Sequence, residues 1–232
     1  MFCSYIYSEE KADITSSTVV PLMFAAKKYL LTGLVSACLD VLEKSISPDT
    51  VCTVLQQSMF FGEDRLKDKC LHFISNNTQL VLGTDAFMGI SHDVLKTVVS
   101  LNAVATTEKH VFESCIKWAK HQLLELGVED PTDEEMRAKL GDVLYEIRFP
   151  TMTAEEFAGL TAHSKILTLE EKHDVYVYLV AKERLDSLKF VTASRLTKNF
   201  VVQRLTVRDS SQWYCNRLTD YAMQYAFIQR WP

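Results

Sequence analysis

A long amphipathic helix between Glu108 and Leu126 is the feature of this sequence that most restricts its fold. Thr107 is placed to cap the start of this helix, and Gly127 follows its end. Apolar residues recur on one side at steps of three and four, and two more widen the stripe: Val111, Cys115, Trp118, Ala119, Leu123 and Leu126, with Phe112 and Ile116. So wide an apolar stripe has to be covered, and the apolar helices on both sides of it can do that.

Helix start signals continue after the central helix. The capping box Thr-x-x-Glu occurs three times and predicts helices that end near residues 147, 161 and 181; it begins at Thr132, Thr153 and Thr168. Between the first two of these helices, residues 148–152 are expected to be extended, because the residue before Pro150 avoids the helical region.

A tight pair of helices is expected near the N-terminus, with Gly33 as the break between them. The first runs from Ser17 or Thr18 to about Leu31, and the second from Leu34 to Ser45. The predicted inward stripe of the first consists of Val20, Phe24, Ala25, Tyr29 and Leu30, and that of the second of Leu34, Val35, Cys38, Leu39 and Leu42.

Composition limits the class of protein. Apolar residues make up 47% and charged residues 24% of the 232 residues, which is enough to form a sizeable core. The longest apolar run, residues 19–26, is far shorter than the about 18 residues that cross a bilayer, and residues 1–11 do not resemble a signal peptide. We therefore expect a protein of the cytoplasm, with the nucleus as the second candidate. Six irregularly spaced cysteines are expected to be reduced core thiols.

The last 51 residues differ from the rest of the chain. Residues 1–181 hold 16 Lys/Arg and 26 Asp/Glu (net −10), whereas residues 182–232 hold 9 and 4 (net +5). The basic residues are scattered, so nucleic-acid binding is the weaker interpretation. Pairs of β-branched and aromatic residues, such as Phe190-Val191 and Trp213-Tyr214, predict short strands here, in an incomplete β unit or a partly ordered tail.

Motifs for catalysis or metal binding are not found. The sequence has no Gly-rich phosphate loop, no His-Glu-x-x-His helix and no Cys-x-x-Cys pair. Ser91-His92-Asp93 has the residue types of a catalytic triad, but neighbouring residues point in different directions, and Ser91 is better explained as a helix cap. We therefore expect no enzyme, no metal and no cofactor.

Two stretches carry a family pattern. They are Val111-Phe112-Glu113-x-x-Ile116-x-Trp118-Ala119 and Ile147-Arg148-Phe149-Pro150-Thr151-Met152-Thr153-x-Glu155-Glu156-Phe157. Together they resemble the BACK domain, which follows a BTB/POZ domain in many ubiquitin-ligase adaptors. The segments Tyr5–Ser8, Ala25–Tyr29 and Leu34–Leu42 are similar to the C-terminal third of a BTB domain. Leu167–Glu171 and the worn motifs Gln203–Leu205 and Ser210–Tyr214 resemble the subgroup that carries a C-terminal PHR β-sandwich.

The resemblance implies a mainly α protein: a helical BTB remnant plus a BACK array of helical hairpins, with a short β-containing tail. The implied segments are the C-terminal part of a BTB domain (1–46), the 3-box and BACK domain (47–181), and a linker with an incomplete PHR-like β segment (182–232). The first half of BTB and most of the PHR sandwich are absent, so we expect a truncated form that is impaired as a ligase component and does not readily form a homodimer.

The resemblance also implies a function. Members of this family are non-enzymatic adaptors that bind a cullin-3-type scaffold and bring a protein substrate to a ubiquitin ligase. By analogy, the residues expected to face the cullin are Tyr29, Leu30 and Leu31 in the turn between the N-terminal pair of helices, and Phe60 and Phe61 in the 3-box turn. Ordinary core packing is the alternative for each of the five. The alternative function is a cullin-independent helical interaction factor or transcription regulator.

Overall fold

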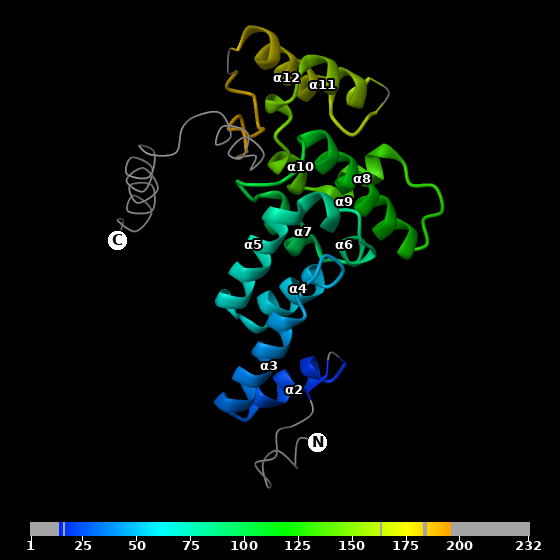
Figure 1. Cartoon of the computed structure of the whole chain (residues 1–232). Coiled ribbons are helices and arrows are strands. Elements are labelled where there is room, and N and C mark those ends of the chain that lie inside the picture. The colour runs from blue at the N-terminus through cyan, green and yellow to red at the C-terminus, as the bar shows by residue number, and fades with distance from the viewer. Residues whose placement is uncertain (1–13, 16, 163, 183–184, 196–232) are drawn as a thin grey trace, which may run out of the picture. The chain divides into compact units, whose positions relative to one another are not determined.

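The computed structural model describes residues 14–15, 17–162, 164–182 and 185–195, and the elements within them are helices (Figure 1). All of these residues belong to one compact unit, residues 1–197. In chain order the helices are α2 (Val19–Lys28), α3 (Thr32–Lys44), α4 (Val51–Phe61), α5 (Asp64–Val81), α6 (Asp85–Met88), α7 (His92–Val99), α8 (Glu108–Glu125), α9 (Asp133–Leu140), α10 (Val143–Glu146), the 3-10 helix η1 (Phe149–Thr151), α11 (Ala154–Thr161) and α12 (Leu169–Ala181). The expected mainly α fold is confirmed.

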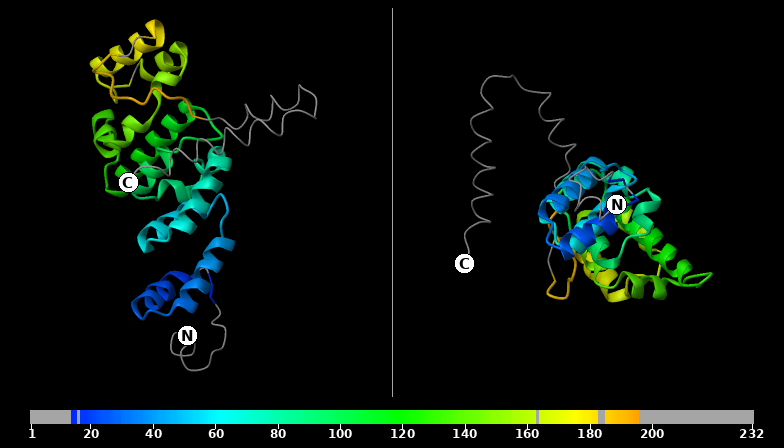
Figure 2. Two further views of the ribbon diagram at one scale, coloured as in Figure 1. Left: turned by 90° about the vertical axis from the view of Figure 1, so that its left-hand side faces the viewer. Right: turned by 90° about the horizontal axis from the view of Figure 1, so that it is seen from below.

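Helices that follow one another in sequence pack together as pairs. The closest pairs are α2 with α3, α4 with α5, α8 with α9, and α11 with α12 (Figures 1 and 2). Longer-range packing joins α6 to α8, α7 to α10, and η1 to α12. The array expected from the sequence is therefore present, and α8 contacts helices that both precede and follow it in the chain.

Helix α8 occupies the position that its apolar stripe requires. The Thr107 hydroxyl caps it by accepting a hydrogen bond from the His110 backbone N–H. Trp118 is fully buried, and its indole N–H donates to the Ile90 carbonyl oxygen at 3.0 Å. Phe112 packs edge-to-face on Phe149, with ring centroids 5.2 Å apart. A buried indole with a satisfied N–H adds apolar area without an unpaired polar atom, which makes Trp118 a good central core residue.

The prediction that Leu126 belongs to the buried stripe of α8 is wrong. Leu126 lies beyond the last helical residue, Glu125, and 70% of its surface is exposed. Gly127 follows with a φ of +86°, a left-handed conformation that turns the chain away from the helix axis. The periodic pattern continued by one residue past the point at which the helix ends, so Leu126 does not reach the core.

Helix α2 buries a different face from the one expected. The buried residues are Val19, Leu22, Met23 and Ala26. Phe24, Tyr29 and Leu30, which were assigned to the inward stripe, are exposed instead. The segment is apolar on nearly every side, so the spacing of its apolar residues does not distinguish the face that packs from the face that does not.

The break between α2 and α3 is also displaced from its expected position. Gly33 lies inside α3, and Leu30 has the left-handed conformation, with a φ of +56°. A leucine in this conformation costs conformational energy that a glycine would not. The chain turns three residues before the glycine that was expected to break the helix.

Two further expectations after α8 are wrong. The helix expected to reach Ile147 is interrupted at Gly141, whose φ of +52° and ψ of −125° separate α9 from α10. Residues 149–151 form a 3-10 helix, not an extended segment, with Pro150 in its first turn. Proline is compatible with the first turn of a helix because the N–H it lacks would have no partner there.

The three capping boxes are confirmed. In each, the threonine side chain accepts from the glutamate backbone N–H and the glutamate carboxylate accepts from the threonine N–H: Thr132 with Glu135, Thr153 with Glu156, and Thr168 with Glu171. Glu171 is also paired with Arg137 at 2.8 Å and accepts from the Tyr145 hydroxyl at 3.1 Å. This network fixes the start of α12 against α9 and α10.

The chain folds back onto the helices after α12. Leu188 and Phe190 are buried, and the Phe190 ring packs edge-to-face on Phe149 with centroids 5.1 Å apart. The short strand expected at Phe190-Val191 is not present; these residues lie in irregular backbone. The other strands expected in the tail, including those around Trp213, lie outside the described residues.

Candidate protein-docking surface

Two neighbouring helix–helix turns expose large apolar side chains. At the α2–α3 turn, Tyr29 and Leu30 are 58% and 85% exposed, and one helical turn earlier Phe24 is 57% exposed. At the α4–α5 turn, Phe60 is 73% exposed and stands edge-on to Phe61 at 5.0 Å between ring centroids. We refer to Phe24, Tyr29, Leu30 and Phe60 together as the two-turn surface. Apolar groups displayed on turns gain free energy when a partner covers them.

A lysine joins the two turns. The Lys27 ammonium group, near the end of α2, donates to the Phe61 carbonyl oxygen at 2.5 Å and lies 2.5 Å from a Glu63 carboxylate oxygen. Phe61 is the last residue of α4, and Gly62 follows with a φ of +69°. Because α4 ends at Phe61, no N–H of a following helical turn donates to its carbonyl oxygen, and the Lys27 ammonium group donates to it instead. A side chain from one turn therefore ends at the other turn.

The structure divides the five residues expected to face a partner. Tyr29, Leu30 and Phe60 are exposed, whereas Leu31 and Phe61 are partly buried and pack against the core. Leu31 and Phe61 thus follow the alternative of ordinary packing.

The sequence does not predict the roles of Phe24 and Lys27. It places Phe24 in the buried stripe of α2, and it indicates no contact for Lys27. Helix α2 has more apolar residues than one buried face can hold, and this indicates that some of them, such as Phe24, are exposed. The Lys27 contact has no local signal, because its partners lie 34 and 36 residues along the chain.

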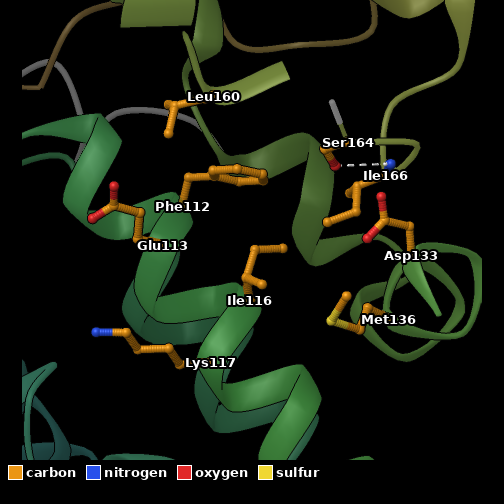
Figure 3. A pocket seen from close by; sticks show the side chains of 9 residues that line it. All are labelled: Phe112, Glu113, Ile116, Lys117, Asp133, Met136, Leu160, Ser164 and Ile166. Atoms are coloured by element: carbon orange, nitrogen blue, oxygen red, sulfur yellow. Dashed lines mark hydrogen bonds between the residues drawn. The ribbon is translucent and has the colours of Figure 1, made fainter. Parts of the chain in front are cut away.

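A separate apolar hollow of about 370 Å³ lies between α8, α9 and α11 (Figure 3). Phe112 and Ile116 come from α8, Met136 from α9 and Leu160 from α11, while Glu113, Lys117 and Asp133 carry the charges at its edge. Figure 3 shows the apolar side chains directed into the space between the helices. Among the residues that line this hollow, no pair of groups has the arrangement of a nucleophile and its base.

The triad-like sequence at 91–93 is structural. The His92 ring bonds through Nε2 to the Leu140 carbonyl oxygen at 2.9 Å and lies 3.4 Å from an Asp142 oxygen. Ser91 occupies the N-cap position of α7, but its side chain makes no cap hydrogen bond, so the expected cap is present in position only; its backbone N–H donates to the Gln56 side-chain oxygen at 3.1 Å. The histidine is thus held by the α9–α10 connection, and its bonds join helices instead of activating Ser91.

The described cysteines are buried free thiols, as expected. Burial raises the pKa of Cys38 to about 11 and the pKa of Cys52, Cys70 and Cys115 to about 12. Such thiols are not nucleophiles at neutral pH. Cys3 and Cys215 lie outside the described residues. Within the described part of the chain, no three His, Cys, Asp or Glu side chains converge on a point that could hold a metal ion.

The chain is similar in sequence to the BACK family and to BTB/POZ domain-containing proteins. Residues 51–162 match the BACK family, described as BTB And C-terminal Kelch. Human BTB/POZ domain-containing protein 6 is 38% identical over 184 residues, which is 78% of this chain and 34% of that protein. The mouse protein of the same name is 36% identical over 214 residues, 92% of this chain and 39% of its own length. Human BTB/POZ domain-containing protein 3 is 35% identical over 204 residues, 86% of this chain and 37% of that protein.

The chain spans about a third to two fifths of the length of the curated relatives it matches. None of the helices in the described ranges is both long enough and apolar enough to pass through a bilayer. The BACK match starts at Val51, the first residue of α4, and ends at Ala162, directly after α11. The BACK match and the similarity to BTB/POZ domain-containing proteins 6 and 3 support a BTB–BACK protein.

Proposed function

We propose that the chain is a non-enzymatic adaptor that binds a cullin-3-type scaffold and connects it to a protein substrate. The observation that carries the proposal is the two-turn surface, in which exposed apolar side chains of two helical pairs are joined by Lys27. Aromatic and leucine side chains at the centre of such a surface are typical anchors for a partner. BTB–BACK similarity supplies the class of partner.

The proposed division of the chain follows from this role. Residues 1–46 would belong to a BTB domain, residues 47–181 to the 3-box and BACK domain, and residues 182–232 to a linker and an incomplete PHR-like segment. The scaffold would contact the first two segments, near Leu30 and Phe60. The substrate would be taken by residues that follow the helical array. We expect this function in the cytoplasm, with the nucleus as the second candidate.

Binding to the N-terminal domain of a cullin-3-type scaffold tests the proposal. Two forms of the protein should be compared: this chain, and any longer form that an in-frame reading of its transcript upstream of Met1 encodes. Binding by either form at micromolar concentration or below supports the proposal. Failure of both forms to bind a cullin that captures an established BTB–BACK protein in parallel would reject it.

The second candidate is a cullin-independent interaction or transcription-regulatory factor. The net charge of +5 in residues 182–232, against −10 in the rest of the chain, is the observation that favours it. Binding of the whole chain to nucleic acid that weakens steeply with salt would support this candidate. A chain that ignores nucleic acid at low salt would exclude that role for the basic segment.

A further inference from the structure

A buried arginine near the end of the described residues contacts several parts of the helical array. The Arg195 side chain is 2% exposed, and its Nε pairs with a carboxylate oxygen of Glu108, which is 10% exposed. Glu108 is the first residue of α8. A carboxylate at this position is stabilised by the unpaired N–H groups of the helix start as well as by the arginine.

The terminal nitrogens of the Arg195 guanidinium also donate to backbone carbonyl groups. One terminal nitrogen, Nη1, donates to the Val99 and Leu101 carbonyl oxygens, the latter at 2.5 Å. The other, Nη2, donates to the Glu146 carbonyl oxygen at 3.2 Å. These carbonyls belong to the ends of α7 and α10 and the loop before α8. A guanidinium presents its donors in a fixed fork, so this set of acceptors determines where Arg195 sits.

A second arginine makes the contact reciprocal. Arg148 belongs to the body of the domain, just before η1, and its Nη1 donates to the Ala193 carbonyl oxygen at 3.0 Å. Its Nη2 donates to the Asn102 side chain at 2.6 Å, and its backbone N–H donates to Glu108 at 3.2 Å. The Arg195 side chain therefore binds the helical array, and the Arg148 side chain of the array binds the segment before Arg195. Glu108 accepts from the Arg195 side chain and from the Arg148 backbone N–H.

Apolar contacts precede the arginine. Leu188 and Phe190 are buried in the core, and the Phe190 ring packs edge-to-face on Phe149. Lys189 lies over the Tyr145 ring at 5.8 Å. Residues 185–195 are thus attached to the array at Leu188, Phe190 and Arg195, with exposed residues between these points, although they contain no helix. Irregular segments with this many buried contacts open much less often than loops that have none.

We propose that residues 185–195 are a strap that fixes the exit point of the chain from the helical array, with Arg195 as its anchor. The strap holds the last described residue, Arg195, beside the α7–α8 connection, where its guanidinium donates to the Val99 and Leu101 carbonyl oxygens. The proposal does not rest on binding to a cullin.

Hydrogen–deuterium exchange of the whole chain tests the strap. For Arg195→Ala we expect amide exchange in residues 186–194 and 100–107 to rise on the order of tenfold or more, with α4 and α5 unchanged. Arg195→Lys keeps the positive charge but loses the planar set of guanidinium donors. Its exchange rates in these segments should lie between those of Arg195→Ala and those of the native chain. Arg65→Ala removes an exposed arginine and should exchange like the native chain.

A second variant tests the proposal if Arg195→Ala unfolds, so that amide exchange is fast throughout the chain. Glu108→Gln keeps the size of the side chain and removes only the charge, and it should raise exchange in the same two segments. Native exchange rates in residues 186–194 of a folded Arg195→Ala protein would overturn the proposal. So would native rates in Glu108→Gln where Arg195→Ala is unfolded.

Discussion

The Lys27 ammonium group lies 2.5 Å from a Glu63 carboxylate oxygen, so the end of α2 is paired with the residue that precedes α5. The same ammonium satisfies the Phe61 carbonyl oxygen. This relationship makes two separate turns into one surface. It also means that the surface depends on a residue that is not itself apolar.

Replacement of Lys27 by Met should weaken the connection between the turns. Methionine keeps the apolar stem but leaves Phe61 and Glu63 without their donor, so the free energy of unfolding should fall by about 0.5–1.5 kcal/mol. Urea denaturation measures this value. Lys44→Met, in the last turn of α3 and exposed, is the matched control and should have little effect. Equal stability of the two variants would show that Lys27 does not join the turns.

Glu171 should make stability depend on pH in the acidic range. Burial raises the pKa of this carboxyl, but hydrogen bonds from Arg137, the Thr168 N–H and Tyr145 lower it to about 2. The folded pKa lies below the ordinary value of about 4.3, so the stabilisation is complete above that value and is lost as pH falls towards 2. It amounts to on the order of 2–3 kcal/mol at neutral pH. In Glu171→Gln, this part of the decline in stability between about pH 5 and 2 should disappear; an unchanged decline would contradict the assignment.

Two glycines should respond to alanine in opposite directions. Gly141 has a φ of +52° and a ψ of −125°, a conformation that alanine adopts only with strain, so Gly141→Ala should destabilise by about 1–3 kcal/mol. Gly159 lies inside α11 with open space at its Cβ position, so Gly159→Ala should stabilise by about 0.5–1 kcal/mol. Thermal unfolding of both variants checks the pair. A stable Gly141→Ala protein would mean that the α9–α10 break does not require glycine.

Trp118 should be the costliest of the α8 residues to shorten. Trp118→Phe removes the hydrogen bond to Ile90 and leaves a cavity, which together should cost about 2–4 kcal/mol of unfolding free energy. Lys120→Ala on the exposed side of the same helix should change stability by no more than about 0.5 kcal/mol. Chemical denaturation of both measures the difference, and similar losses would remove Trp118 from the centre of the core.

Local signals explain what the sequence predicted well. The start of α8 at Thr107 and the three capping boxes each depend on residues within three positions of one another, and all four are present. Errors occurred where local signals were weak or competed. Helix α2 is apolar on nearly every side, so its buried face had no periodic signature. Leu30, not Gly33, takes the left-handed conformation, because the packing of α2 on α3 sets the turn.

Long-range contacts could not be read from the sequence. Arg195 and Glu108 are 87 residues apart, and the basic composition of the C-terminal segment gave no reason to place one of its arginines in the core. The candidate surface shows the same limit. Resemblance points to Tyr29, Leu30 and Phe60, but the exposure of Tyr29 and Leu30 depends on the face that α2 buries. Phe24 and Lys27 became visible only with the helices in place.

The affinity of the two-turn surface for the N-terminal domain of a cullin-3-type scaffold tests the central claim most directly. Isothermal titration should be carried out with whichever form of the chain binds, and with Leu30→Asp, Phe60→Asp and Leu169→Asp. Leu169 is 83% exposed, like Leu30 at 85%, but lies at the start of α12. We expect the first two substitutions to raise Kd by on the order of tenfold or more and the third to leave it within about twofold. Unchanged affinity in both Leu30→Asp and Phe60→Asp, with the proteins folded, would contradict the account.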